Sequence, residues 1–214
     1  MMHGPMTASP RTGLQVLLWA LTLLRVVLLP VFLGVAARAE AATEAGLDPS
    51  GHRLLLVAVL LAMGLSDLGD GWVARRYGLA TQVGAVVDAV ADKLVQVTVA
   101  AFFALADGSA FTRLPLWFLA LVVARDAMLG AGWLTLRSRR VPVRVVHRLH
   151  GRASSVGVFL VFFALILGLP RSALPLLLVP VALLVVASTV AYVRDGVAQL
   201  PERDGHRPRA EGSG

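Results

Sequence analysis

Four aspartates lie close together in an otherwise strongly apolar part of the chain. Asp67, Asp70, Asp88 and Asp92 occur within the segment DLGDGWVARRYGLATQVGAVVDAVAD. On an α-helix, Asp67 and Asp70 share about one face, and Asp88 and Asp92 lie one turn apart on the following helix. Because only a short turn separates the two helices, they should pack as antiparallel neighbours. The spacing therefore predicts that the four carboxylates converge.

Such a cluster of carboxylates needs a counter-charge. Like charges in a partly dehydrated cleft shift toward the protonated form unless a cation neutralises them. Ligation by oxygen alone favours Mg²⁺ or Mn²⁺ over zinc, and the chain has no cysteine that could supply thiolate ligands. We therefore expect Asp67, Asp70, Asp88 and Asp92 to hold a divalent metal, with two ions in the complete site.

The aspartates also have a purely structural interpretation. Asp67 or Asp70 could cap a turn, and Asp88 or Asp92 could pair with a neighbouring basic residue such as Lys93. Of nine aspartates in the chain, however, four lie in this one window. That clustering favours a functional site.

The order of residue types in this window, D-x2-D-G-x2-A-R-x8-G-x3-D-x3-D, resembles the signature of the CDP-alcohol phosphotransferase family. The resemblance implies six transmembrane helices, usually a homodimer, and transfer of a substituted phosphate from a CDP-linked donor to an alcohol with release of CMP. It further implies that Asp67, Asp70 and Asp88 hold the metals that grip the CDP pyrophosphate. Asp92 would then be the general base that deprotonates the acceptor hydroxyl, with further metal contact.

Small and basic residues inside the signature fit the same site. Without large side chains, Gly71, Ala74 and Gly84 would let a flat nucleotide lie against the helix backbones. The alternative is close packing of helices through small residues. Arg75 would either contact phosphate or hold an aspartate in place.

Further segments resemble the glycerophospholipid branch of this family. LTLLRVVLLPVF provides Thr22, Arg25 and Pro30 of a first-helix pattern, and Lys93 directly follows Asp92 as in phosphatidylglycerophosphate synthases and eukaryotic-type cardiolipin synthases. This implies CDP-diacylglycerol as donor, with phosphatidylglycerol or glycerol-3-phosphate as acceptor and inositol phosphate or another alcohol as the alternative. Arg25 lies well inside a span, so a carboxylate or phosphate partner is expected.

Other arginines are candidates for contacts with the acceptor or its phosphate. Arg125, followed by Asp126, resembles an Arg-acidic pair of the same branch, although the two could simply neutralise each other within the membrane. The basic stretch RSRRVPVRVVHRLHGR contributes Arg144, Arg148 and Arg152. Its alternative role is to set topology and attract anionic lipids.

The composition identifies the elements that must position these residues. With 57% hydrophobic and 15% charged residues and a mean hydropathy of +0.75, the chain is predicted to be an all-α polytopic membrane protein. Six spans are expected, at about 14–35, 54–75, 84–106, 114–136, 153–169 and 173–194. Residues 14–200 would form one domain between mobile tails at 1–13 and 201–214, and a Pro and two Gly predict an external loop over 36–53.

The arginines predict the orientation of the chain. One set of loops and tails holds thirteen of them, whereas the opposite set holds only Arg38, Arg53, Arg113 and Arg171. Both termini and the aspartate segment should therefore face the cytoplasm, against the lipids of a plasma membrane. Nineteen Arg against one Lys, with no Asn, suggest a bacterial source. No soluble domain accompanies the net charge of +7, which argues against nucleic acid as a partner.

Acidic residues within a membrane protein are also compatible with two other classes of function. A small cation-coupled transporter would also place acidic groups in the membrane, but it predicts acids near the midplane and repeated halves. A catalytically silent assembly protein predicts the loss of a signature aspartate, and all four are present.

Overall fold

The computed structural model describes residues 10–78, 82–106, 108–138 and 149–198. All regular structure in these ranges is helical, which confirms the all-α prediction. The six helices are α1 (Pro10–Glu44), α2 (Ser50–Tyr77), α3 (Gln82–Leu105), α4 (Leu116–Ser138), α5 (Leu149–Ile166) and α6 (Leu174–Ala198).

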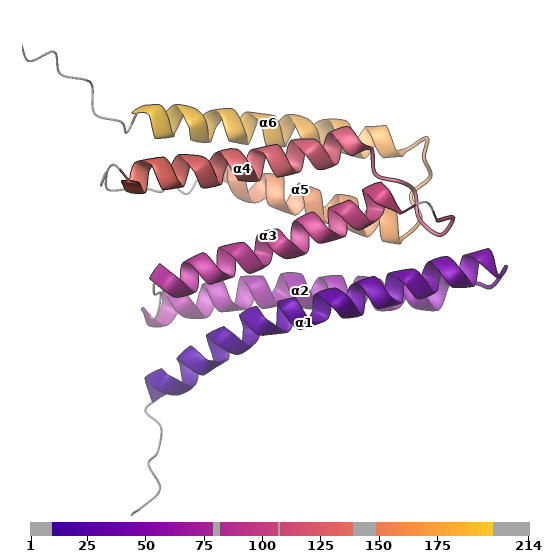
Figure 1. Cartoon of the computed structure of the whole chain (residues 1–214), viewed down its shortest axis with the longest axis horizontal. Coiled ribbons are helices and arrows are strands. Elements are labelled where there is room, and N and C mark those ends of the chain that lie inside the picture. Colours follow the sequence, from indigo (N-terminus) through magenta and orange to yellow (C-terminus); the bar gives the residue numbers. More distant parts are fainter. Residues whose placement is uncertain (1–9, 79–81, 107, 139–148, 199–214) are drawn as a thin grey trace, which may run out of the picture.

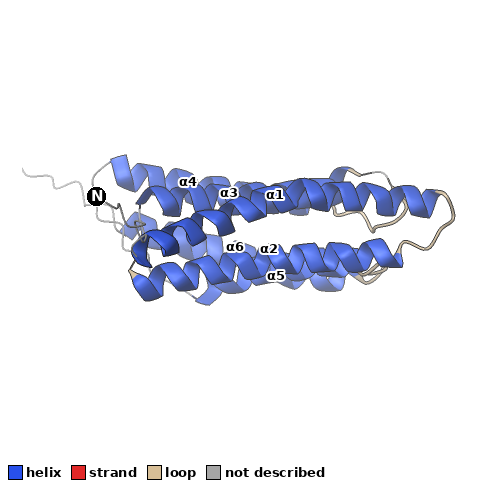
Figure 2. Ribbon diagram, turned by 90° about the horizontal axis from the view of Figure 1, so that it is seen from below, coloured by secondary structure: helices blue, strands red, loops and turns tan. Residues whose placement is uncertain are grey.

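The helices form a bundle of two layers, with α1, α3 and α4 in one layer and α2, α5 and α6 in the other (Figures 1 and 2). Within the layers α3 packs on both α1 and α4, and α5 packs on both α2 and α6; across them α1 meets α2, α3 meets α5, and α4 meets α6. The central helix α3 therefore touches both the α1–α2 edge and the α4 edge of the bundle.

The external loop expected over 36–53 is much shorter in the structure, so that prediction was wrong. The alanine-rich segment after Val35 continues α1 to Glu44, because alanine has the highest helix propensity. The helix ends at Gly46, whose φ of 72° is the left-handed conformation of a glycine C-cap. Two capping hydrogen bonds close it, from Leu47 N to Ala42 O (2.8 Å) and from Gly46 N to Thr43 O (3.0 Å).

Four helical stretches in the described part of the chain are long and apolar enough to cross a membrane. They are Leu18–Glu44, Ser50–Asp70, Leu116–Thr135 and Leu174–Val197, and a shorter apolar stretch covers Ala153–Ile166 of α5. Many large apolar side chains on these helices are exposed on the outside of the bundle, as expected for a surface that faces lipid. The chain is therefore a membrane protein.

Aromatic side chains join the two layers away from the aspartates. Phe103 of α3 lies 6.3 Å from Phe32 of α1 and 6.2 Å from Phe162 of α5, measured between ring centroids. All three side chains are buried. This apolar core holds α1, α3 and α5 in register and so fixes the helix ends that carry the polar residues.

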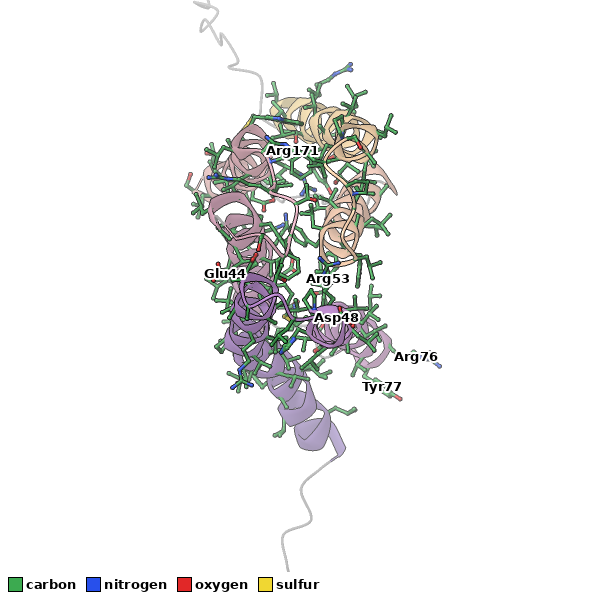
Figure 3. The ribbon with its side chains drawn as sticks, turned by 90° about the vertical axis from the view of Figure 1, so that its right-hand side faces the viewer. Glu44, Asp48, Arg53, Arg76, Tyr77 and Arg171 are labelled. Atoms are coloured by element: carbon green, nitrogen blue, oxygen red, sulfur yellow. The ribbon has the colours of Figure 1, made fainter. Side chains whose placement is uncertain are left out.

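The loops at the end opposite the aspartates are tied to one another. Glu40 accepts a hydrogen bond from Ala110 N (2.8 Å), and Arg53 donates one to Ala110 O (2.5 Å). Thr112 donates to Leu169 O (2.6 Å), which connects the α3–α4 and α5–α6 loops. Figure 3 looks onto this end, where Arg53 lies close to Asp48 and the α1–α2 loop.

Candidate active site

Three of the four predicted aspartates meet between α2 and α3. Asp67 and Asp70 lie one turn apart near the end of α2, and Asp88 lies in the second turn of α3. One carboxylate oxygen from each falls within 4.8 Å of the other two. We call these three residues the aspartate triad. No other group of three acidic or histidine residues in the described ranges comes as close together.

The triad encloses the side chain of Arg25 from α1. Arg25 is only 1% exposed, and its NH1 donates to Asp67 Oδ1 at 2.9 Å. Its NH2 donates to both Asp70 and Asp88. A guanidinium group presents several donors in a planar fork, so one arginine can serve three carboxylates in a way that a lysine cannot. This is the carboxylate partner that an arginine inside a span was expected to have.

Short contacts between α1 and its neighbours hold Arg25 in place. One turn before it, Thr22 donates to Leu18 O (3.2 Å) and reaches Asp88 Oδ1 at 3.5 Å. Ser66 of α2 donates to Leu21 O at 3.0 Å. These contacts bring α1 against the helices that carry the triad.

The charges of the triad suit a divalent cation. Three ionised carboxylates and one guanidinium leave a formal charge of −2. Asp67 is partly open to solvent, with a side chain that is 42% exposed, whereas Asp70 is buried. Oxygen-only ligands with this charge fit Mg²⁺ or Mn²⁺, so the triad could bind a metal.

Asp92 lies one turn beyond Asp88 on α3 and is not part of the triad. Its side chain is 34% exposed, and its Oδ2 is 4.0 Å from Nζ of Lys93. The four carboxylates therefore do not form one compact cluster. Asp92 is about as exposed as Asp67 and Asp88, and it differs from them in lying outside the group of carboxylate oxygens that could share one ion.

Arg125 of α4 belongs to a second polar cluster. Its NH2 donates to Ser154 of α5 at 3.0 Å, and its NH1 lies 3.4 Å from Asp126 Oδ1. Asp126 in turn forms an ion pair with Lys93 at 3.1 Å. Arg125 is therefore bound to protein groups, as the self-neutralising alternative predicts.

Residues 18–193 of the chain match the family described as CDP-alcohol phosphatidyltransferase. The match covers most of the chain and all six helices in part. The chain belongs to this family. The resemblance of the aspartate signature is thereby confirmed.

Several named proteins are similar to this family member. A "Putative cardiolipin synthase" of Mycobacterium tuberculosis is 32% identical over 69% of this chain and 63% of that protein. A "Probable phosphatidylglycerophosphate synthase" of the same species is 37% identical over 50% of this chain and 46% of that protein. A "Probable cardiolipin synthase (CMP-forming)" of Drosophila melanogaster is 35% identical over 39% of this chain and 25% of that protein.

The chain thus spans less than two thirds of the length of the curated relatives that it matches. No solved structure matches it significantly.

The remaining signature positions of this family member lie on the same two helices. Gly71, Ala74 and Arg75 continue α2 after Asp70, and Gly84 lies in the first turn of α3, one turn before Asp88. The side chains of Ala74 and Arg75 lie outside the described residues. The backbone therefore places these small residues beside the triad, at the helix ends that flank it.

The basic stretch is only partly within the described residues. Arg144 and Arg148 lie outside them, and Arg152 is in the first turn of α5 with a side chain that is also outside.

Three buried polar residues in or near the two polar clusters were missed by the sequence analysis. Ser66, Gln96 and Ser188 are buried polar residues that the sequence analysis did not select. The available signal was that each is a polar residue within an apolar helix, where such residues usually hydrogen-bond across a helix interface.

Proposed function

We propose that this chain catalyses the CMP-forming transfer of a phosphatidyl group from CDP-diacylglycerol to an alcohol. The acceptor is phosphatidylglycerol, as in a cardiolipin synthase, or glycerol-3-phosphate, as in a phosphatidylglycerophosphate synthase. The observation that carries the proposal is the meeting of Asp67, Asp70 and Asp88 at one end of the bundle, in a chain of this family. The names of its relatives support these two acceptors.

In this proposal the triad holds Mg²⁺ or Mn²⁺, with Asp92 as a further ligand once two ions are bound. When bound, the metal would offset the negative charge of the CDP pyrophosphate and of the departing CMP. Arg25 would hold the three carboxylates in place behind the metal, because it already hydrogen-bonds all of them. The same position makes Arg25 a support for the site and leaves contacts with the acceptor to other residues.

Asp92 is the proposed general base. It would accept the proton of the acceptor hydroxyl while the acceptor oxygen bonds to the phosphorus atom and the bond from phosphorus to the CMP oxygen breaks. A positioned base contributes a factor of about 10² to 10⁴ to such a step. Its place outside the triad supports this assignment, because the base must stay available to the substrate while the triad holds the metal.

The nucleotide would lie over the small residues next to the triad. Gly71, Ala74 and Gly84 would let the base and ribose approach the backbones of α2 and α3, and Arg75 would contact phosphate or hold an aspartate. Arg144, Arg148 and Arg152 would attract the phosphate of the acceptor from the cytoplasmic side, because positive charge near the membrane surface attracts phosphorylated groups.

The proposed arrangement in the membrane has six spans and both termini in the cytoplasm of a bacterial cell, in its plasma membrane. The helix ends at Pro10 and Ala198 lie at the same end of the bundle as the triad (Figure 1), which supports a cytoplasmic site. CDP-diacylglycerol would enter from the bilayer and the acceptor from the cytoplasm. We propose a homodimer, as is usual in this family.

The test is CMP release from CDP-diacylglycerol by detergent-purified protein with Mg²⁺. Parallel reactions contain phosphatidylglycerol, glycerol-3-phosphate, inositol phosphate or no acceptor, and we expect release with one of the first two. Asp92→Asn should reduce this release by about 10² or more. Asp48→Asn is the matched control, because Asp48 is an exposed aspartate at the opposite end of the bundle.

If no acceptor supported CMP release, the proposed reaction would be contradicted. Cation transport would then be the next function to test. Full activity of Asp92→Asn would contradict only the role of Asp92.

A further inference from the structure

Lys93 lies between two carboxylates and is nearer to the one that the proposed chemistry does not use. Its Nζ is 3.1 Å from Asp126 Oδ1 of α4 but 4.0 Å from Asp92 Oδ2 of its own helix. Gln96 of α3 also reaches Lys93, with its Oε1 at 3.4 Å from Nζ. The ammonium group is thus drawn away from Asp92 and toward α4.

We propose that Asp126 is a positioning residue for Asp92 that acts through Lys93. By forming the closer ion pair, Asp126 keeps the ammonium group away from the carboxylate of Asp92. That carboxylate then remains available to the acceptor hydroxyl. This inference rests on the function proposed above.

Asp126 cannot act by contacting substrate, because its side chain is only 10% exposed. The carboxylate of Asp126 is also held by its neighbour Arg125. Arg125 NH1 lies 3.4 Å from the same Oδ1 atom, and Arg125 NH2 donates to Ser154 at 3.0 Å. The hydroxyl of Ser154 lies 3.4 Å from that of Ser188 on α6. The position of Asp126 is therefore set by contacts that span α4, α5 and α6.

Lys93, in contrast, is free to change partner. Its side chain is 38% exposed, and its long aliphatic stem can adopt several rotamers. If Asp126 lost its charge, Asp92 would be the nearest carboxylate left to Lys93 among the described residues. A buried or half-buried charge without a partner is unfavourable, so the ammonium should move onto Asp92. The base would then be occupied by an ion pair.

A three-residue mutant cycle measured by thermal unfolding tests this shift without any enzymatic assay. Lys93→Met and Asp92→Asn are combined in the wild-type protein and again in Asp126→Asn. We expect the coupling between Lys93 and Asp92, read as the non-additive part of the change in Tm, to be at least twice as large once Asp126 is neutral. An unchanged or smaller coupling would overturn the inference.

Steady-state kinetics provide the second readout. Asp126→Asn should lower kcat about tenfold, less than the loss of the base itself, with KM for CDP-diacylglycerol changed less than about twofold. Adding Lys93→Met to Asp126→Asn should restore most of kcat, because the ammonium that blocks Asp92 is gone. If Asp126 only stabilised the fold, the double variant would be no more active than the single one.

Asp48→Asn serves again as the matched control, since it makes the same chemical change at the opposite end of the bundle. It lowers Tm itself by weakening the bonds to Ser50, but in place of Asp126→Asn it should leave the coupling between Lys93 and Asp92, and kcat, unaltered. If wild-type protein released no CMP with any acceptor, the proposed function would fail, while the unfolding cycle would still decide whether Asp126 holds Lys93 away from Asp92.

Discussion

Replacing Arg25 with glutamine should destabilise the protein strongly, and metal should reverse much of the loss. Arg25 is 1% exposed and is the one cation that the structure shows bound to all three triad carboxylates. Removing one partner from a buried ion pair costs about 3–5 kcal/mol, because the remaining charge is left uncompensated. For a chain of this size we expect Tm without metal to fall by about 10 °C.

Metal should restore the lost stability because Arg25→Gln makes the formal charge of the site more negative. Without Arg25 the three carboxylates carry a formal charge of −3 instead of −2, so the triad should bind a divalent cation more tightly. A ligand at a hundred times its Kd stabilises the folded state by about 2.7 kcal/mol. Thermal unfolding in detergent, with EDTA and with excess Mg²⁺, should therefore show a larger metal-induced rise in Tm for Arg25→Gln than for the wild type.

Arg53→Gln is the matched control. Arg53 is also partly buried, but it binds Ala110 O at the opposite end of the bundle and lies 5.9 Å from the ring centroid of Phe111. Its loss should lower Tm equally with and without Mg²⁺. An Arg25→Gln variant with the same behaviour would refute the idea that Arg25 and the metal compensate the same carboxylates.

Four further predictions concern the scaffold. Phe103→Ala should cost about 3–5 kcal/mol in denaturant unfolding, because its ring is buried between the two helix layers; an unaltered midpoint would contradict the role given to this core. Gly168→Ala should cost about 1–2 kcal/mol, since Gly168 has φ +83° and a Cβ there would lie 2.6 Å from Arg53 NH1. Gly34→Ala, with no atom within 4 Å of the added carbon, should be neutral or stabilising in the same assay. Hydrogen bonds from the hydroxyl and backbone N of Ser50 lower the pKa of Asp48, so its contribution is complete above the unfolded pKa and is lost as pH falls through the folded pKa. The difference in Tm between wild type and Asp48→Ala should shrink over that acidic range, and a constant difference would show that the charge of Asp48 is irrelevant.

The sequence could predict the triad but not its separation from Asp92. Helical periodicity and the short connection between two helices correctly bring Asp67, Asp70 and Asp88 to one place. The expected close packing of α2 on α3 was wrong, because both helices pack instead on α1, whose Arg25 joins the three carboxylates. Asp88 and Asp92 are also one turn apart, which suggests a common site. Two side chains at this spacing can reach one ion, but whether they do depends on their rotamers and on the packing of the neighbouring helices. Periodicity identifies a shared face but not which carboxylates share one ion.

The partners of Arg25 and Lys93 depend on how the helices rotate against one another. A buried arginine in the first helix indicates that an anionic partner exists, but whether the partner is a carboxylate or a phosphate depends on the packing of α1 on α2 and α3. In the same way, Lys93 could have paired with Asp92 alone. Asp126 becomes its closer partner only because α4 packs beside α3.

The two polar clusters differ in charge, and this difference determines where a metal can bind. Asp92, Lys93, Asp126 and Arg125 alternate in sign along a chain of contacts, and their formal charges cancel. The triad with Arg25 keeps a charge of −2. A divalent cation therefore gains the most at the triad, and it would have to displace an existing ion pair in order to bind beside Lys93. The two clusters are neighbours along α3, because Asp88 of the triad and Asp92 lie one turn apart on that helix. The packing of Phe103 between α1 and α5 holds α3 in place, so the apolar core helps to keep Lys93 beside Asp126.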